Sequence, residues 1–163
     1  MSRTRFLPLI KHRFPGPRGR FRVAAGLLIL ASILACGDDT EEPNPQNVTR
    51  LWHVVSCEYV NAADGAQRVD LVAAGWVIDL HINDNGAFRY SFTPPGEALD
   101  FYDGQWRIDG SELVLTRTGS PFSWSFEVVV QEEAMSMSGA DAEYDFDADG
   151  SPEAATWNLD LRT

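Results

Sequence analysis

The strongest constraint on the fold of this chain is an alternation of apolar and polar residues with a period of two, which recurs from residue 49 to the end. It is clearest over residues 122–130, where Phe, Trp, Phe, Val and Val take every second position. Such alternation is typical of a strand with one buried face. We therefore expect eight strands, at 50–60, 75–83, 86–93, 101–109, 112–118, 122–131, 134–139 and 153–162.

Turn dipeptides of Asp or Asn followed by Gly separate many of these segments, and they suit the positive φ angles of tight hairpins. The pair Asp103-Gly104 lies inside a strand and is interpreted as a bulge. Short connections make consecutive strands pair antiparallel. The pattern predicts an all-β domain, an eight-stranded antiparallel up-and-down barrel whose closure removes exposed edges. An open sandwich is the alternative, and the one helix expected is a short one over 67–74.

The first 35 residues differ from the rest, because they contain seven basic residues and no acidic one. Residues 23–35 carry no charge, and this segment is shorter than the roughly 20 residues that span a bilayer. It matches the apolar part of a secretory signal peptide. The segment ends in Ile33-Leu34-Ala35-Cys36 and an acidic stretch follows at once.

This junction resembles the lipobox of bacterial lipoproteins. The resemblance implies cleavage before Cys36 and acylation of that residue, for example with palmitate, so that several chains anchor the protein to a membrane. Gly37 in place of Asp implies sorting to the outer membrane, facing the periplasm or the cell surface. An ordinary signal peptide or an N-terminal membrane anchor, with Cys36 incidental, is the alternative. Residues 36–48 are interpreted as a disordered, solvated tether.

The remaining residues, 49–163, are similar to the lipocalin-like domains of bacterial lipoproteins. The resemblance rests on residues 51–56 with Trp52, on the turn and aromatic of residues 84–88, and on the Gly-x-Trp strand, turn and Leu-rich strand of residues 104–113. It implies an eight-stranded barrel with an apolar cavity and no catalytic residue.

Charge and residue types exclude several functions. From residue 36 onward the chain has six arginines and 24 acids, a net charge of −18, which argues against nucleic acid or an anionic membrane face as a partner of the mature domain. Two cysteines exclude a disulfide scaffold and a Cys-based zinc site. His53 and His81 have neither the spacing of a zinc site nor a nucleophile elbow nearby. We therefore expect a monomer that is not an enzyme, and a buried, inert Cys57.

Aromatic residues on several strands are the candidate ligand site. They either fill the barrel or line a pocket for a small apolar molecule, and periodicity leaves both open. A binding module with an apolar ligand and a structural or interaction module with a filled barrel are therefore the two hypotheses. The candidate pocket residues are Trp76, Phe88, Tyr90, Trp106, Trp124, Phe126 and Trp157.

Acidic residues occupy every second position from 141 to 149, and Gly150 follows. The spacing of Asp145, Asp147 and Asp149 matches the opening of an EF-hand loop, but no Glu stands at the twelfth position. The segment is either a solvated acidic hairpin or a looser Ca²⁺ site with Glu153 as an added ligand.

Overall fold

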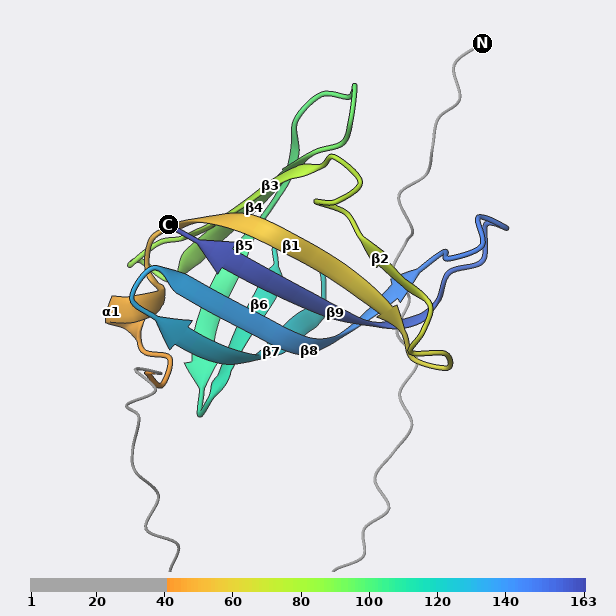
Figure 1. Ribbon diagram of the computed structural model, residues 1–163. Coiled ribbons are helices and arrows are strands. Elements are labelled where there is room, and N and C mark those ends of the chain that lie inside the picture. The colour runs from red at the N-terminus through yellow and green to blue at the C-terminus, as the bar shows by residue number, and fades with distance from the viewer. Residues whose placement is uncertain (1–40) are drawn as a thin grey trace, which may run out of the picture.

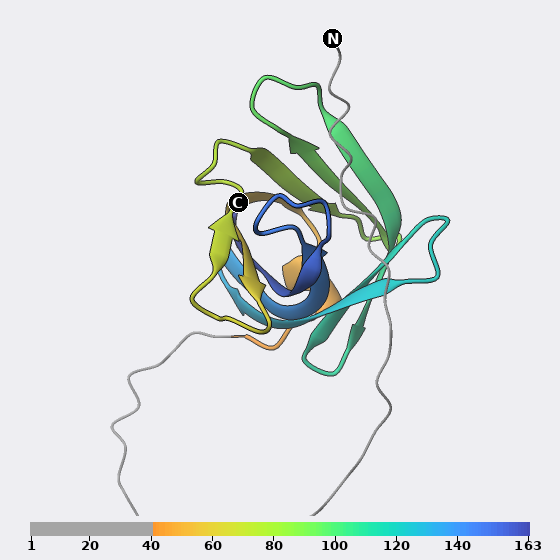
Figure 2. The same ribbon diagram turned by 90° about the vertical axis from the view of Figure 1, so that its right-hand side faces the viewer.

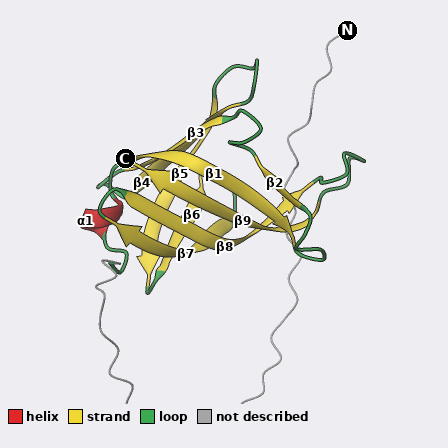
Figure 3. Cartoon of the chain, viewed as in Figure 1, coloured by secondary structure: helices red, strands yellow, loops and turns green. Residues whose placement is uncertain are grey.

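The computed structural model describes residues 41–163, so the predicted signal peptide and Cys36 lie outside the described part (Figures 1 and 3). One four-residue helix precedes a chain of strands. The elements are α1 (Pro45–Val48), β1 (Leu51–Asn61), β2 (Arg68–Asp70), β3 (Val77–Ile82), β4 (Ala87–Thr93), β5 (Asp100–Asp109), β6 (Glu112–Arg117), β7 (Ser123–Gln131), β8 (Ala134–Tyr144) and β9 (Glu153–Arg162).

The strands form one antiparallel sheet that closes on itself. Each strand from β3 to β9 pairs with the next, β1 pairs with β3, and β1 also pairs with β9, which closes an eight-stranded barrel. The short β2 pairs with the far end of β1. Figure 2 looks along the barrel from the end that carries the loop between β8 and β9. The predicted barrel is confirmed, and the sandwich is not formed.

These segments form strands because their apolar side chains, at every second position, all point into the core when the chain is extended. On β7 the side chains of Trp124, Phe126, Val128 and Val130 are buried, and Ser123 and Glu127 are exposed. This confirms the faces expected from the sequence, except that Phe122 precedes the strand and is 37% exposed. Burial of one apolar face per strand supplies the main favourable term in folding.

Two irregularities shift this alternation. The β1–β9 register slips between Val54 and Ser56, so Val55 faces outward and Cys57 faces the core. The β8–β9 register slips between Met137 and Ala140, next to Gly139 with φ +88°. A bulge inserts one extra residue and so exchanges the two faces of the strand beyond it.

Gly104 is not a bulge, which corrects the sequence interpretation. The pairing of β5 with β4 and β6 continues through it without a shift. A Cβ at this position would overlap the carbonyl oxygen of Thr116 and the ring of Phe88. Glycine is therefore required for close packing rather than for an irregular backbone.

The prediction of a helix over residues 67–74 is also wrong. Residues 68–70 form β2, and a turn occupies 71–75. The Asp70 carboxylate accepts hydrogen bonds from the backbone N–H groups of Cys57, Val72 and Ala73. A side chain that bonds nearby N–H groups in this way stabilises a turn in competition with a helix.

The prediction of a disordered tether is wrong for residues 41–48, the part of it that the structure describes. Asn44 caps α1 by accepting from the N–H groups of Gln46 and Asn47. Val48 is fully buried, and its carbonyl accepts a hydrogen bond of 2.8 Å from the indole of Trp52. Glu41 N donates to Val130 O at 2.9 Å, which adds the segment to the edge of β7. This segment therefore packs against one end of the barrel.

Candidate functional site

The centre of the barrel is an aromatic cluster around Trp157. The Trp157 ring lies edge-on to Tyr90, Trp124 and Phe126, with centroids 5.4, 5.6 and 5.2 Å apart. It also stacks on Tyr59 at 5.8 Å. These are favourable distances for aromatic pairs. Rings from strands β1, β4, β7 and β9 thus meet at one point inside the barrel.

The predicted pocket residues divide into a central group and two outliers. Phe88, Tyr90, Trp124, Phe126 and Trp157 are buried in one apolar core. Trp76 is half-buried and packs on Phe92. Trp106 is half-buried near the other end, where its indole donates to Asn83 O at 2.8 Å. The structure therefore does not bring all seven residues into one lining.

Several aromatic residues extend the cluster toward the end of the barrel that carries the β8–β9 loop. Tyr59 stacks on Tyr144 at 5.0 Å, and Tyr144 contacts Phe146. Tyr102 packs on Phe92, under the guanidinium of Arg117 at 3.9 Å. These residues lie outside the set of pocket residues predicted from the sequence. The alternation of Tyr144 with acidic neighbours was the signal that could have identified one of them.

Cys57 lies beside the aromatic cluster. The Trp157 indole donates to its Sγ at 3.3 Å, and the Tyr90 hydroxyl lies 3.8 Å away. Burial raises the pKa of the Cys57 thiol to about 11, although these two hydrogen bonds act in the opposite direction. A protonated, buried thiol is a poor nucleophile, in agreement with the expected inert role. Burial likewise raises the pKa of Tyr59 and Tyr90 well above the usual value.

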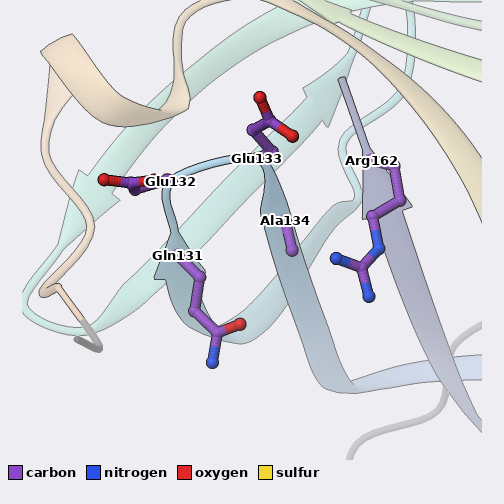
Figure 4. Close-up of a pocket in the computed structure, with 5 residues that line it drawn as sticks. All are labelled: Gln131, Glu132, Glu133, Ala134 and Arg162. Carbon is purple, nitrogen blue, oxygen red and sulfur yellow. The ribbon is translucent and has the colours of Figure 1, made fainter. Parts of the chain in front are cut away.

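Two hollows stand out in the described part of the chain, and both lie on the outside of the barrel near α1. One of about 390 Å³ is lined by Gln131, Glu132, Glu133, Ala134 and Arg162 (Figure 4). The other, of about 290 Å³, shares Gln131, Ala134 and Arg162 with the first and is also lined by Val55, Val129 and further residues of β8 and β9. In Figure 4 the Arg162 guanidinium and the Gln131 amide flank Ala134. Neither hollow is lined by the seven predicted pocket residues.

The acidic segment is divided between β8, which carries Asp141 and Glu143, and the loop that follows this strand. Asp145, Asp147 and Asp149 each place a carboxylate oxygen within 4.8 Å of the others. Asp145 accepts from the N–H groups of Asp149 and Gly150, at 3.1 and 2.9 Å. Ala148 and Gly150 have φ angles of 60° and 91°. The chain turns here as the sequence required, and the three carboxylates converge.

Glu153 does not join these three carboxylates. It stands at the start of β9 and accepts a hydrogen bond of 2.9 Å from Phe146 N. Hard cations such as Ca²⁺ take six to eight oxygen ligands, so three carboxylates alone form an incomplete set. Ca²⁺ binding by this loop stays a prediction.

His53 and His81 lie on the outer face of β1 and β3. His53 Nδ1 lies 2.6 Å from Asp79 Oδ1; the His53 side chain is 58% exposed and that of Asp79 is 33% exposed. In the described part of the chain no serine or cysteine side chain is hydrogen-bonded to His53 or His81. This arrangement resembles a surface ion pair more than the nucleophile, base and orienting group of covalent catalysis.

Comparisons with protein-family models, with curated proteins and with solved structures found no match to this chain. Within residues 41–163 no helix is both long enough and apolar enough to cross a membrane.

Proposed function

We propose that this protein is a non-catalytic lipoprotein of the cell envelope, anchored through Cys36 and carrying a lipocalin-like barrel as a filled structural or interaction module. The aromatic cluster around Trp157 is the observation that favours a filled barrel over a barrel that binds a small apolar ligand. Its rings come from four strands and occupy the place where a carrier would hold its ligand. A small apolar ligand would have to displace these packed rings.

The anchor is supported by the sequence. Residues 23–35 are uncharged, Ala35 precedes Cys36, and charged residues follow from Asp38. Several acyl chains on one residue give firm membrane binding, whereas a single chain is marginal. Gly37 in place of Asp favours the outer membrane, and the domain acts there as a monomer.

Flotation of membranes from cells that express the full chain tests the anchor. Wild-type protein should float with the vesicles after a high-salt wash, and Cys36→Ser should remain in the soluble fraction. Mass spectrometry should find acyl groups on Cys36 of the wild type only. Retention of Cys36→Ser in the membrane would contradict the lipoprotein assignment.

Native mass spectrometry of the protein purified from its own membranes tests the filled barrel. The expected mass is that of the acylated polypeptide alone. A neutral apolar fluorescent probe such as N-phenyl-1-naphthylamine should gain no emission on mixing with the folded protein. A copurified small molecule that is lost from a Trp157→Ala variant would instead favour the ligand-binding hypothesis.

A further inference from the structure

We propose that the anchor holds the α1 end of the barrel against the membrane, so that the opposite end faces away from it. This orientation rests on the proposed lipidation of Cys36. Only residues 37–40 separate Cys36 from Glu41, which is bonded to β7. Five residue steps span at most about 18 Å in any conformation. The point where Glu41 meets β7 therefore stays close to the lipid headgroups.

The barrel segments beside that point are fixed by several contacts. Glu41 N bonds to Val130 O, one residue before the end of β7. The Arg50 guanidinium donates to Glu132 O at 3.1 Å, and Thr163 N donates to Glu133 O at 3.1 Å. The turn between β7 and β8, the C-terminus and α1 thus form one end of the barrel (Figure 1).

The acidic loop belongs to the other end. In the β8–β9 pair, Ala134 faces Arg162 at the α1 end and Tyr144 faces Glu153 at the far end. Eleven residues of β8 at about 3.3 Å each, tilted by about 40°, place the two ends on the order of 25 Å apart along the barrel. Figure 1 shows α1 and this loop on opposite sides of the barrel.

The orientation decides which surfaces of the barrel a partner in the periplasm or outside the cell can reach. The end that faces away carries the loop with Asp145, Asp147 and Asp149, and the β4–β5 loop with Leu99, which is 66% exposed. The outer hollows beside Gln131 and Arg162 lie at the membrane end, where the lipid surface is their nearest neighbour.

Energy transfer to labelled lipid measures the orientation. Single cysteines at two exposed turns, Glu132→Cys and Ser151→Cys, carry a donor dye, and the buried Cys57 stays unlabelled. The acylated proteins are placed in phosphatidylcholine vesicles with acceptor-labelled headgroups. We expect transfer from position 132 to be about twofold or more higher than from position 151, because position 151 lies farther from the bilayer.

A Gly-Ser insert of about twelve residues between Thr40 and Glu41 is the matched control. Its flexible coil frees the barrel from the surface, so it should lower transfer from position 132 and reduce the difference between the two sites. Equal transfer from both sites, or higher transfer from position 151, in protein that floats with the vesicles would overturn the orientation. Protein that fails to float and shows no transfer would instead refute the anchor itself.

Discussion

The indole Nε1 of Trp157 donates a hydrogen bond of 3.3 Å to Sγ of Cys57, which joins the last strand of the barrel to the first across the seam that closes it. The two residues are 100 positions apart in the chain. Tyr59, two residues after Cys57, pairs with Trp157 in the β1–β9 register. Closure of the barrel and assembly of its aromatic centre therefore depend on the same contacts.

Chemical modification tests the state of Cys57. In a Cys36→Ser variant, which leaves a single thiol, Ellman's reagent at pH 8 should react at least about a hundredfold more slowly with native than with unfolded protein. The unfolded thiol ionises near pH 8.5, but burial raises the pKa of the native thiol to about 11. Between about pH 8.5 and pH 11 the unfolded thiol loses its proton while the native thiol keeps it. The free energy of unfolding therefore falls as the pH rises through this range. Equal rates in both states would mean that the thiol is accessible.

Two adjacent valines of β7 test the faces of the barrel. Val130 is 2% exposed and Val129 is 45% exposed. Val130→Ala should lower the free energy of unfolding by about 2–3 kcal/mol, because it removes buried methyl groups and leaves a cavity. Val129→Ala should cost less than about 1 kcal/mol. Urea titrations give both values, and a reversed order would show that the strand has the opposite face inward.

Gly104 is expected to tolerate no side chain. Gly104→Ala should destabilise the protein by about 3 kcal/mol or more, because the new Cβ meets backbone as well as the Phe88 ring. Gly65→Ala is the control, since its Cβ would have nothing within 4 Å and its φ angle is not positive. That variant should be neutral or slightly more stable. Thermal unfolding compares the two, and similar melting temperatures would argue against close packing at Gly104.

Asp70 should make the stability depend on pH. Partial burial raises the pKa of this carboxyl, but hydrogen bonds from Cys57 N, the Ser56 hydroxyl and the N–H groups after it outweigh burial and hold the pKa below its usual value. Its contribution is present above the unfolded pKa of about 3.9 and is lost as the pH falls through the lower native pKa. Asp70→Asn should cost about 1–2 kcal/mol at pH 7, measured by urea unfolding. This cost should shrink at low pH, and a constant difference across the range would contradict the role of the charge.

Ca²⁺ should stabilise the loop that follows β8 if its carboxylates bind the ion. A ligand of the native state adds about 2.7 kcal/mol at a hundredfold excess over Kd, and extracellular sites have Kd values of roughly 10⁻⁴–10⁻³ M. Millimolar Ca²⁺ should therefore raise the melting temperature modestly. Na⁺ at equal ionic strength measures the rise in melting temperature that comes from charge screening alone. The Asp147→Asn variant should keep this rise and lose the additional rise that is specific to Ca²⁺. Equal responses of the two proteins would identify a plain acidic loop.

The barrel could be predicted because the features that indicate it, residue alternation and turn dipeptides, lie within short segments of the sequence. Alternation along β7, from Trp124 to Val130, selects a strand and its inner face without reference to any other segment. Asn85-Gly86 marks a tight turn between β3 and β4, and Gly86 has the positive φ of 83° that such a turn requires. Short connections then leave few topologies open, and a closed barrel is the one that removes all edges.

The candidate site could be predicted only in part. Five of the seven pocket residues share the core, because inward-facing aromatics of a small barrel must meet at its centre. Whether they line a cavity depends on how the rings pack, which no periodicity encodes. Asp145, Asp147 and Asp149 converge as their spacing suggested, whereas Glu153 is held by Phe146 N at the start of β9.

Side-chain period and turn chemistry within short segments were enough to predict eight of the strands, their antiparallel pairing and most of the inner face, and they favoured a barrel over an open sandwich. The pairing of β1 with β9 that closes the barrel, the places where the alternation breaks and the contacts at the ends of the barrel appear only in the folded chain. The bulge at Val55 turns Cys57 and Tyr59 toward Trp157, and residues 41–48 pack on the barrel despite their polar composition. Both depend on contacts between residues far apart in the chain, whose energies outweigh local preference.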